Sequence, residues 1–178
     1  IFYKFRNKLP FNCLETIYFA MIHSQLYYGI EIYGNTTKAY LDPLLKMNNI
    51  ILRVLQNKPL RTPVEILYKN YNTLQIPQLR DLAIVCLVHK FVHNVKELPE
   101  IYHHYFLFNY EIHDHDTRAK GDLHKNKITS DTGKRNIQIL GCNLWNKIPK
   151  SIRSIKNLHL FKQKLKLFIL NSKDNIFD

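Results

Sequence analysis

Histidine and aspartate, which bind metals and transfer protons, alternate in one short stretch of the chain. It reads His113-Asp114-His115-Asp116-Thr117-Arg118, and three further histidines stand near it, His103, His104 and His124. Such a set is compatible with a zinc site or a His-dependent metallonuclease, which would need His113, His115 and a further ligand to converge on one ion. The alternative is a polar turn in which the aspartates accept backbone hydrogen bonds and pair with Arg118. We expect the turn, and with it no metal and no cofactor in this chain.

Other signatures of catalysis are missing from the sequence. No glycine-rich nucleotide loop and no nucleophile elbow occurs. An aromatic-x-Asp-Asp pair, which would hold the two metals of a polymerase, is also missing, and Asp42 beside Pro43 does not replace it. We therefore predict no catalytic residue. Cys13, Cys86 and Cys142 are odd in number and far apart, so we expect structural thiols in a reducing intracellular compartment, the nucleus or the cytoplasm.

Positive charge is concentrated toward the C-terminal end. The chain has 26 Lys+Arg and 14 Asp+Glu, a net charge of +12. Residues 1–118 hold 13 basic and 10 acidic residues, giving +3, whereas residues 119–178 hold 13 and 4, giving +9. This asymmetry favours a polyanion, above all nucleic acid, over an anionic membrane surface. The basic residues predicted to contact phosphate are Lys120, Lys125, Lys127, Lys134, Arg135, Lys147, Lys150, Arg153, Lys156, Lys162 and Lys166.

The elements that position these residues are predicted to be helices. Apolar residues recur at helical spacing over 12–28, with Asn12 as N-cap. A second helix runs to about Asn57, and Pro43 either opens it, with Asp42 as cap, or kinks it near its start. Glycines bracket the stretch 30–33, which we interpret as a loop or turn. Thr62, Pro63 and Glu65 indicate a capping box for a short helix to about Tyr71. Pro77 opens a helix that is apolar nearly all round and therefore buried, and Pro99 restarts the chain for a turn or two.

Periodicity is lost between 109 and 140, and a second helical region follows. Its only tryptophan, Trp145, stands in a Leu-Trp-Asn-x-Ile-Pro phrase. Beyond it, Leu158, Phe161, Leu165 and Phe168 form one apolar stripe of a basic helix. We therefore predict an all-α chain: a helical bundle over 1–108, then a basic C-terminal arm over 109–178 that contains a long irregular segment and ends in an amphipathic helix. No apolar run reaches the roughly 18 residues of a membrane span. The chain begins at Ile1, so we expect a piece of a longer protein.

Four phrases, in order, carry a resemblance to a known family. They are Leu26-Tyr27-Tyr28-Gly29-Ile30-Glu31-Ile32-Tyr33-Gly34-Asn35, then 113–118, then Leu144-Trp145-Asn146-Lys147-Ile148-Pro149, then Phe161-Lys162-Gln163-Lys164-Leu165-Lys166. They look like the Y-G-I-E-x-[WY]-G, H-x-H-x-T-R, L-W-N-x-[LI]-P and F-K-x-x-[LI]-K phrases found downstream of the polymerase domain in LINE-type (non-LTR, jockey-like) retrotransposon reverse transcriptases. The resemblance spans roughly residues 10–166.

The resemblance implies a thumb-like and C-terminal region of an RNA-directed DNA polymerase, with the polymerase carboxylates upstream of this chain. Its partners would be template RNA or an RNA–DNA hybrid, together with the upstream polymerase domain of the parent polypeptide. It supplies no catalytic residue and no role for His113, His115 or Trp145. The expected function is therefore non-catalytic nucleic-acid binding. The alternatives are a domesticated helical module that binds protein through an apolar groove, and the metallonuclease.

Overall fold

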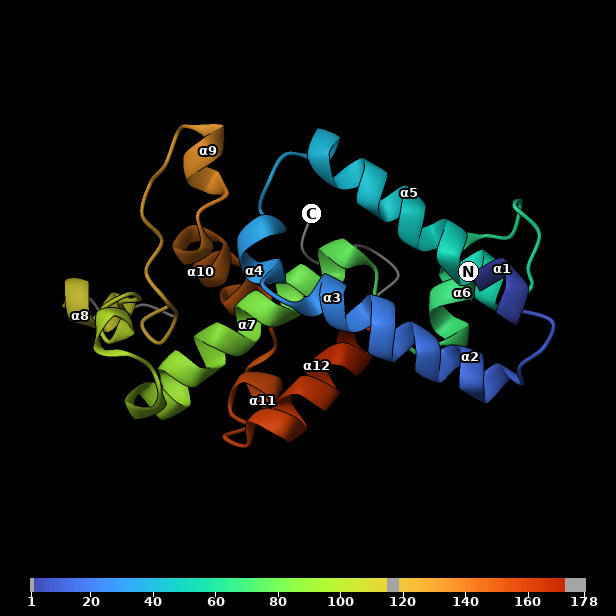
Figure 1. The fold of residues 1–178 in the computed structure, drawn as a ribbon. Coiled ribbons are helices and arrows are strands. Elements are labelled where there is room, and N and C mark those ends of the chain that lie inside the picture. The colour runs from blue at the N-terminus through green and yellow to red at the C-terminus, as the bar shows by residue number, and fades with distance from the viewer. Residues whose placement is uncertain (1, 115–118, 172–178) are drawn as a thin grey trace. The chain divides into compact units, whose positions relative to one another are not determined.

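Helices form nearly all the regular structure of the computed structural model, which describes residues 2–114 and 119–171 (Figure 1). Over those ranges the β-structure is one isolated antiparallel bridge, Phe108 to Leu123. The all-α prediction is therefore confirmed. The chain divides into two compact units, Ile1–Arg80 and Asp81–Asp178. The division falls within α7 (Ile76–Asn94) rather than at the predicted 108–109, because Val88 and His89 of that helix pack on residues of the C-terminal half.

A helical run from Phe11 to Tyr27 forms one side of the first unit. It consists of α2 (Phe11–Ile17), a π-helical stretch (Tyr18–His23) and α3 (Ser24–Tyr27), and α1 (Phe2–Phe5) precedes it. The predicted helix over 12–28 is thus present. Its predicted cap is wrong, because Pro10 occupies the N-cap position in an extended conformation and no side chain caps the helix.

The glycine-bracketed stretch forms a tight corner. Gly29 has a φ of 64°, a left-handed conformation that glycine adopts without steric cost, and α4 (Ile30–Tyr33) follows at once. We predicted a loop or turn here, and the structure has one turn of helix. The hydroxyl of Tyr33 donates to the carbonyl of Leu26, which closes the corner. A Cβ on Gly34 would lie 3.0 Å from Cγ of Arg80. The close contact with Arg80 therefore explains the second glycine of this stretch.

The other long helix of this unit, α5 (Lys38–Leu55), contains Pro43 five residues after its start. Of the two alternatives for Pro43, a helix that opens there with Asp42 as cap is wrong: the N-cap position belongs to Thr37, and buried Leu41 belongs to the turn before the proline. Pro43 lies inside the helix near its start, where the other alternative placed it. The short helix α6 (Val64–Asn70) follows as predicted, but the predicted capping box is wrong, because Pro63 occupies the N-cap position and no side chain caps the helix. Residues of α2, the π-helical stretch, α5, α6 and Tyr71 share one core, made of Leu14, Tyr18, Leu52, Leu55, Leu67, Tyr68 and Tyr71.

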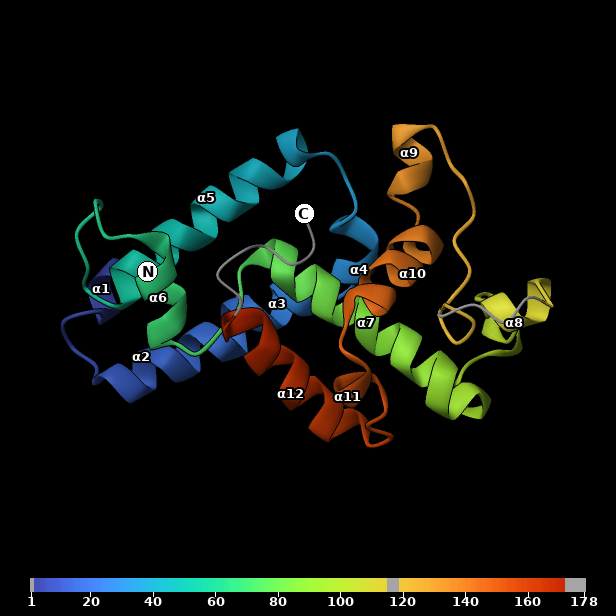
Figure 2. The same cartoon turned by 180° about the vertical axis from the view of Figure 1, so that it is seen from behind.

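The second unit packs α10 (Ile137–Lys147) and α12 (Leu158–Asn171) on α7, as Figures 1 and 2 show. A Cβ on Gly141 would lie 2.9 Å from Cγ2 of Val88 and from Cε1 of Phe106, which shows how closely α10 approaches α7. Trp145 lies 5.9 Å from Phe161, centroid to centroid. Along α12 the fully buried residues are Phe161, Leu165 and Ile169, whereas the predicted stripe residues Leu158 and Phe168 are half-buried.

Short elements connect these helices, and the predicted irregular region is held by backbone bonds. The 3₁₀ turns Val95–Glu97 and Glu100–Tyr102 lead to α8 (Asn109–Ile112), and α9 (Asp131–Lys134) precedes α10. The amide of Asn109 donates to the carbonyl of Asp122 at 3.0 Å, and that of His124 to the carbonyl of Leu107 at 2.7 Å. After α10 comes α11 (Lys150–Arg153), which begins behind Pro149.

Candidate nucleic-acid interface

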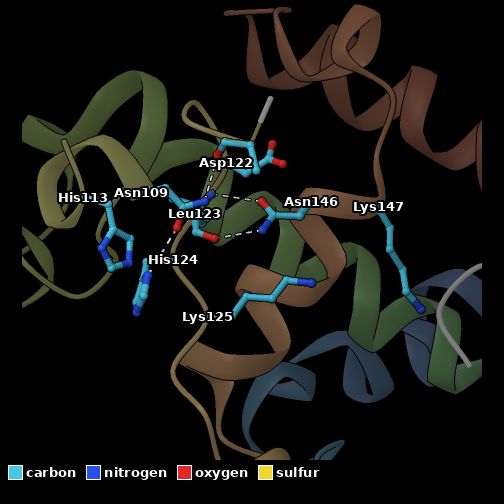
Figure 3. Close-up of a pocket in the computed structure, with 9 residues that line it drawn as sticks. Asn109, His113, Asp122, Leu123, His124, Lys125, Asn146 and Lys147 are labelled. Carbon is cyan, nitrogen blue, oxygen red and sulfur yellow. Dashed lines mark hydrogen bonds between the residues drawn. The ribbon is translucent and has the colours of Figure 1, made fainter. Parts of the chain in front are cut away.

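The predicted basic arm surrounds a hollow of about 730 Å³ in the second unit (Figure 3). Its lining comes from α8, from the irregular segment after Ala119 and from the end of α10: Asn109, His113, Ala119, Asp122, Leu123, His124, Lys125, Asn146 and Lys147. Lys125 and Lys147 are exposed, and the imidazoles of His113 and His124 lie 5.7 Å apart, centroid to centroid. The hollow therefore combines ammonium groups with polar and aromatic edges.

Asn146 fixes the floor of this hollow. Its Nδ2 donates to the carbonyl of Leu123 at 2.8 Å, and its Oδ1 accepts from the amide of the same residue at 3.0 Å (Figure 3). The side chain thus pairs with Leu123 much as a neighbouring strand would, and Leu123 is fully buried. This contact, between an asparagine in the tryptophan phrase and the irregular segment, was not predicted. The Leu-Trp-Asn-x-Ile-Pro phrase is the feature of the sequence that pointed to Asn146.

A second hollow of about 350 Å³ adjoins the first, and Asp122 lines both. Its other lining residues include Trp145, Lys150, Arg153 and Ser154. Arg153 Nη1 donates to Asp122 Oδ1 at 2.7 Å, with side chains only 13% and 26% exposed. The ion pair therefore lines the second hollow, and it engages the guanidinium that we expected to contact phosphate.

Of the predicted phosphate contacts, Lys125, Lys147, Lys150 and Arg153 are brought together around these hollows. Lys120 and Lys127 belong to the irregular segment, and Lys156 to the link between α11 and α12. Lys134 and Arg135 lie at α9, and Lys162 and Lys166 on α12. None of these seven residues lines either hollow.

Charge in this region is only partly balanced by carboxylates. Residues 119–171 contain 12 basic residues and two acidic ones, Asp122 and Asp131. Asp122 pairs with Arg153, and Asp131 pairs with Lys134 at 3.1 Å. The hydrogen bond from Lys134 lowers the pKa of Asp131, and burial followed by the charge of Lys162 lowers the pKa of Lys166. Since both carboxylates of the stretch are engaged, it keeps an excess of positive charge that its own carboxylates do not neutralise.

The predicted histidine turn is only partly described. His115, Asp116, Thr117 and Arg118 lie outside the described residues. His113 and Asp114 are exposed, and Nδ1 of His124 lies 3.2 Å from Oδ1 of Asn109. Over 2–114 and 119–171, no three His, Cys, Asp or Glu side chains gather as a metal site requires. Burial raises the pKa of the Cys86 and Cys142 thiols to about 11, so both are protonated near neutral pH.

Comparison of the chain with protein-family models, with curated proteins and with solved structures finds no match. In the described part of the chain, every helix is too short or too polar to cross a bilayer.

Proposed function

We propose that this chain binds RNA or an RNA–DNA hybrid through the two adjoining hollows of its second unit, without catalysing a reaction itself. The observation that carries the proposal is that Lys125, Lys147 and Lys150 line the two hollows, in a stretch whose carboxylates are already paired. The resemblance in its phrases suggests the setting, a region downstream of the polymerase domain of a LINE-type reverse transcriptase. There the upstream polymerase domain would be its partner in the parent polypeptide.

The chemistry of the hollows suits a phosphate backbone better than base recognition. Lysine ammonium groups contact phosphate as mobile point charges and carry no sequence information. The imidazoles of His113 and His124 offer surfaces against which an unpaired base can stack. Binding of this kind releases counterions, and it therefore weakens steeply as salt is raised.

The test compares two triple variants in which the same amount of charge is removed. Lys125, Lys147 and Lys150 are changed to Gln in one, and Lys4, Lys8 and Lys58, which are exposed in the first unit, in the other. Affinity for single-stranded RNA and for a hybrid is measured between about 50 and 200 mM salt. We expect the first variant to bind weakly and its log–log salt slope to fall by about one for each lysine that binds phosphate, and the second to change little. Equal effects, or salt-independent binding by the unaltered chain, would refute the proposal.

One observation favours the second candidate, a module that binds protein. The first unit has an apolar groove of about 290 Å³, lined by Met21, Ile22, Gln25, Leu26, Leu44, Met47, Asn48 and Ile51. Met21 and Met47 are each 60% exposed, and methionines adapt to an amphipathic helix laid in such a groove. Because this unit holds 10 basic and 4 acidic residues, a net +6, the occupant would be a helix with acidic flanks. Met47→Asp should abolish its binding, and the Lys125/Lys147/Lys150 variant should not.

A further inference from the structure

Two histidines of α7 bind the backbone that links α11 to α12. Nε2–H of His89 donates to the carbonyl of Ile155 at 2.6 Å, and Nε2–H of His93 donates to the carbonyl of Arg153 at 2.8 Å. A carbonyl oxygen only accepts, so each ring carries a proton on Nε2. The two rings, 4.6 Å apart on successive helical turns, thus fasten a segment that lies 66 and 60 residues further along the chain.

The surroundings of His89 favour its neutral form. The ring is fully buried, stacks on Phe161 at 4.2 Å and meets the edge of Trp145 at 6.3 Å. Its Nδ1 is buried with no hydrogen-bond partner in the described part of the chain. A second proton, on Nδ1, would therefore create a buried cation whose Nδ1–H has no acceptor, an arrangement that costs free energy.

No carboxylate of the described residues near His89 is in a position to compensate such a cation. The helices packed around it carry these titratable groups: Arg80, Asp81, Cys86, Lys90 and His93 on α7, Cys142 and Lys147 on α10, and His159, Lys162, Lys164 and Lys166 on α12. The one carboxylate among them is Asp81, which precedes His89 by eight residues and therefore lies about 12 Å away along α7. The adjacent segment adds Arg153, whose guanidinium occupies the carboxylate of Asp122. Burial lowers the pKa of His89, the bond to Ile155 opposes this, and His93 adds to the lowering.

We infer that His89 and His93 are positioning residues, whose Nε2–H groups hold the basic segment 150–156 in place beside the hollows, and that protonation of His89 releases this segment. This segment carries Lys150, Arg153 and Lys156, three of the predicted phosphate contacts. The role in RNA binding rests on the proposed function, whereas the release on protonation does not. Because the pKa of His89 is lower in the folded chain, its contribution is complete above the ordinary value of 6.5 and declines as the pH falls below it.

The first experiment uses the full chain without RNA. Amide hydrogen exchange of residues 150–157 is followed between about pH 7.5 and 5.5, corrected for intrinsic rates. We expect the open population to rise by up to about tenfold per pH unit for each proton taken up. Trp145, the single tryptophan, contacts both rings and reports the same change by fluorescence. Protection of 150–157 that does not vary with pH would overturn the inference.

Variants separate His89 from the other histidines. His89→Gln keeps an amide donor that cannot titrate, so the response to acid should be lost. If His89→Gln fails to fold, the exchange of residues 150–157 in the unaltered chain still decides. His159→Gln is the matched control, because His159 is exposed on α12 and bonded to Gln163. A control that loses the acid response as fully as His89→Gln does would refute the inference.

RNA affinity, measured over the same pH range, tests the positioning role. On acidification the unaltered chain should lose affinity several-fold relative to His89→Gln. If the segment opens but the two chains keep the same ratio of affinities, the histidine pair does not position the segment for RNA. If neither chain binds RNA at any pH, the proposed function fails, and the exchange measurement alone then decides whether protonation releases the segment.

Discussion

Arg153 is the basic side chain whose surroundings differ most from those of the lysines near it. Its guanidinium pairs with Asp122 at 2.7 Å, its carbonyl accepts from His93, and its Nε is buried without a hydrogen-bond partner among the described residues. Lys147 and Lys150, by contrast, are exposed. A positive side chain beside a hollow is either engaged by groups of the fold or available to a ligand. Its burial and its hydrogen-bond partners distinguish these two cases.

Arg153→Gln should therefore affect stability more than a neighbouring lysine does. Removing one member of a partly buried, hydrogen-bonded pair leaves the other unsatisfied, so we expect the free energy of unfolding to fall by about 1–3 kcal/mol. Urea denaturation followed by Trp145 fluorescence measures this. Lys150→Gln should change it by less than about 0.5 kcal/mol.

A double-mutant cycle with Asp122→Asn completes this test. If the two side chains act as a pair, the second substitution should cost clearly less than it does alone. Simple additivity of the two decreases in stability would show that Arg153 and Asp122 stabilise the fold through other contacts.

Among the elements, α10 shows how a glycine inside a helix allows that helix to approach its neighbour closely. A glycine inside a helix normally costs about 0.5–1 kcal/mol relative to alanine. At Gly141, however, a Cβ would lie 2.9 Å from both Val88 and Phe106, so the missing side chain lets α10 lie against α7 and Phe106. The glycine brings the helix that carries Trp145 and Asn146 against the core of the second unit.

Gly141→Ala should consequently destabilise the chain in spite of the better helix propensity of alanine. We expect the free energy of unfolding to fall by about 1–3 kcal/mol, because the extra methyl group overpacks the contact. Gly121→Ala is the matched control: a Cβ there meets nothing within 4 Å, so it should be neutral or slightly stabilising. Thermal unfolding of the two variants gives the comparison, and a stabilised Gly141→Ala chain would contradict the close packing of α10 on α7.

Most helices could be predicted from the sequence because their apolar spacing is local information. The start of α5 and the buried side of α12 could not. The capping and proline signals at Asp42 and Pro43 are compatible with two starts, and burial of Leu41 selects the earlier one. On α12, Ile169 rather than Phe168 is fully buried, because the neighbouring helices decide which side of a broad apolar face is covered.

On the scale of the whole molecule, the net charge is shared equally by the two compact units, although it is shared unequally by residues 1–118 and 119–178. The first unit holds 10 basic and 4 acidic residues and the second 16 and 10, so each carries +6. Within the second unit residues 81–118 sum to −3, from 3 basic and 6 acidic residues, and residues 119–178 to +9. The unit that contains the hollows is therefore polarised rather than uniformly basic.

Lysine-dominated contacts predict little discrimination among nucleic-acid sequences. Two single-stranded RNAs of equal length and unrelated sequence should bind within a few-fold of each other, because phosphate contacts carry no base information. If the interface makes six or more phosphate contacts, affinity should fall by about 10³-fold or more between 50 and 200 mM salt. Titration of labelled RNAs measures both. A preference of more than about a hundredfold for one sequence would instead indicate base readout by residues other than the lysines.

The amino-acid sequence by itself determined the all-α class, the places of most helices and the excess of positive charge after residue 118, since spacing and composition are properties of neighbouring residues. It also singled out the phrase around Trp145. Only the tertiary structure decided that Asn146 binds Leu123, that Arg153 is occupied by Asp122, and that His89 and His93 fasten the segment after α11. Those partners stand 23 to 66 residues apart, and no local pattern records which distant groups the packing of helices brings within hydrogen-bond distance.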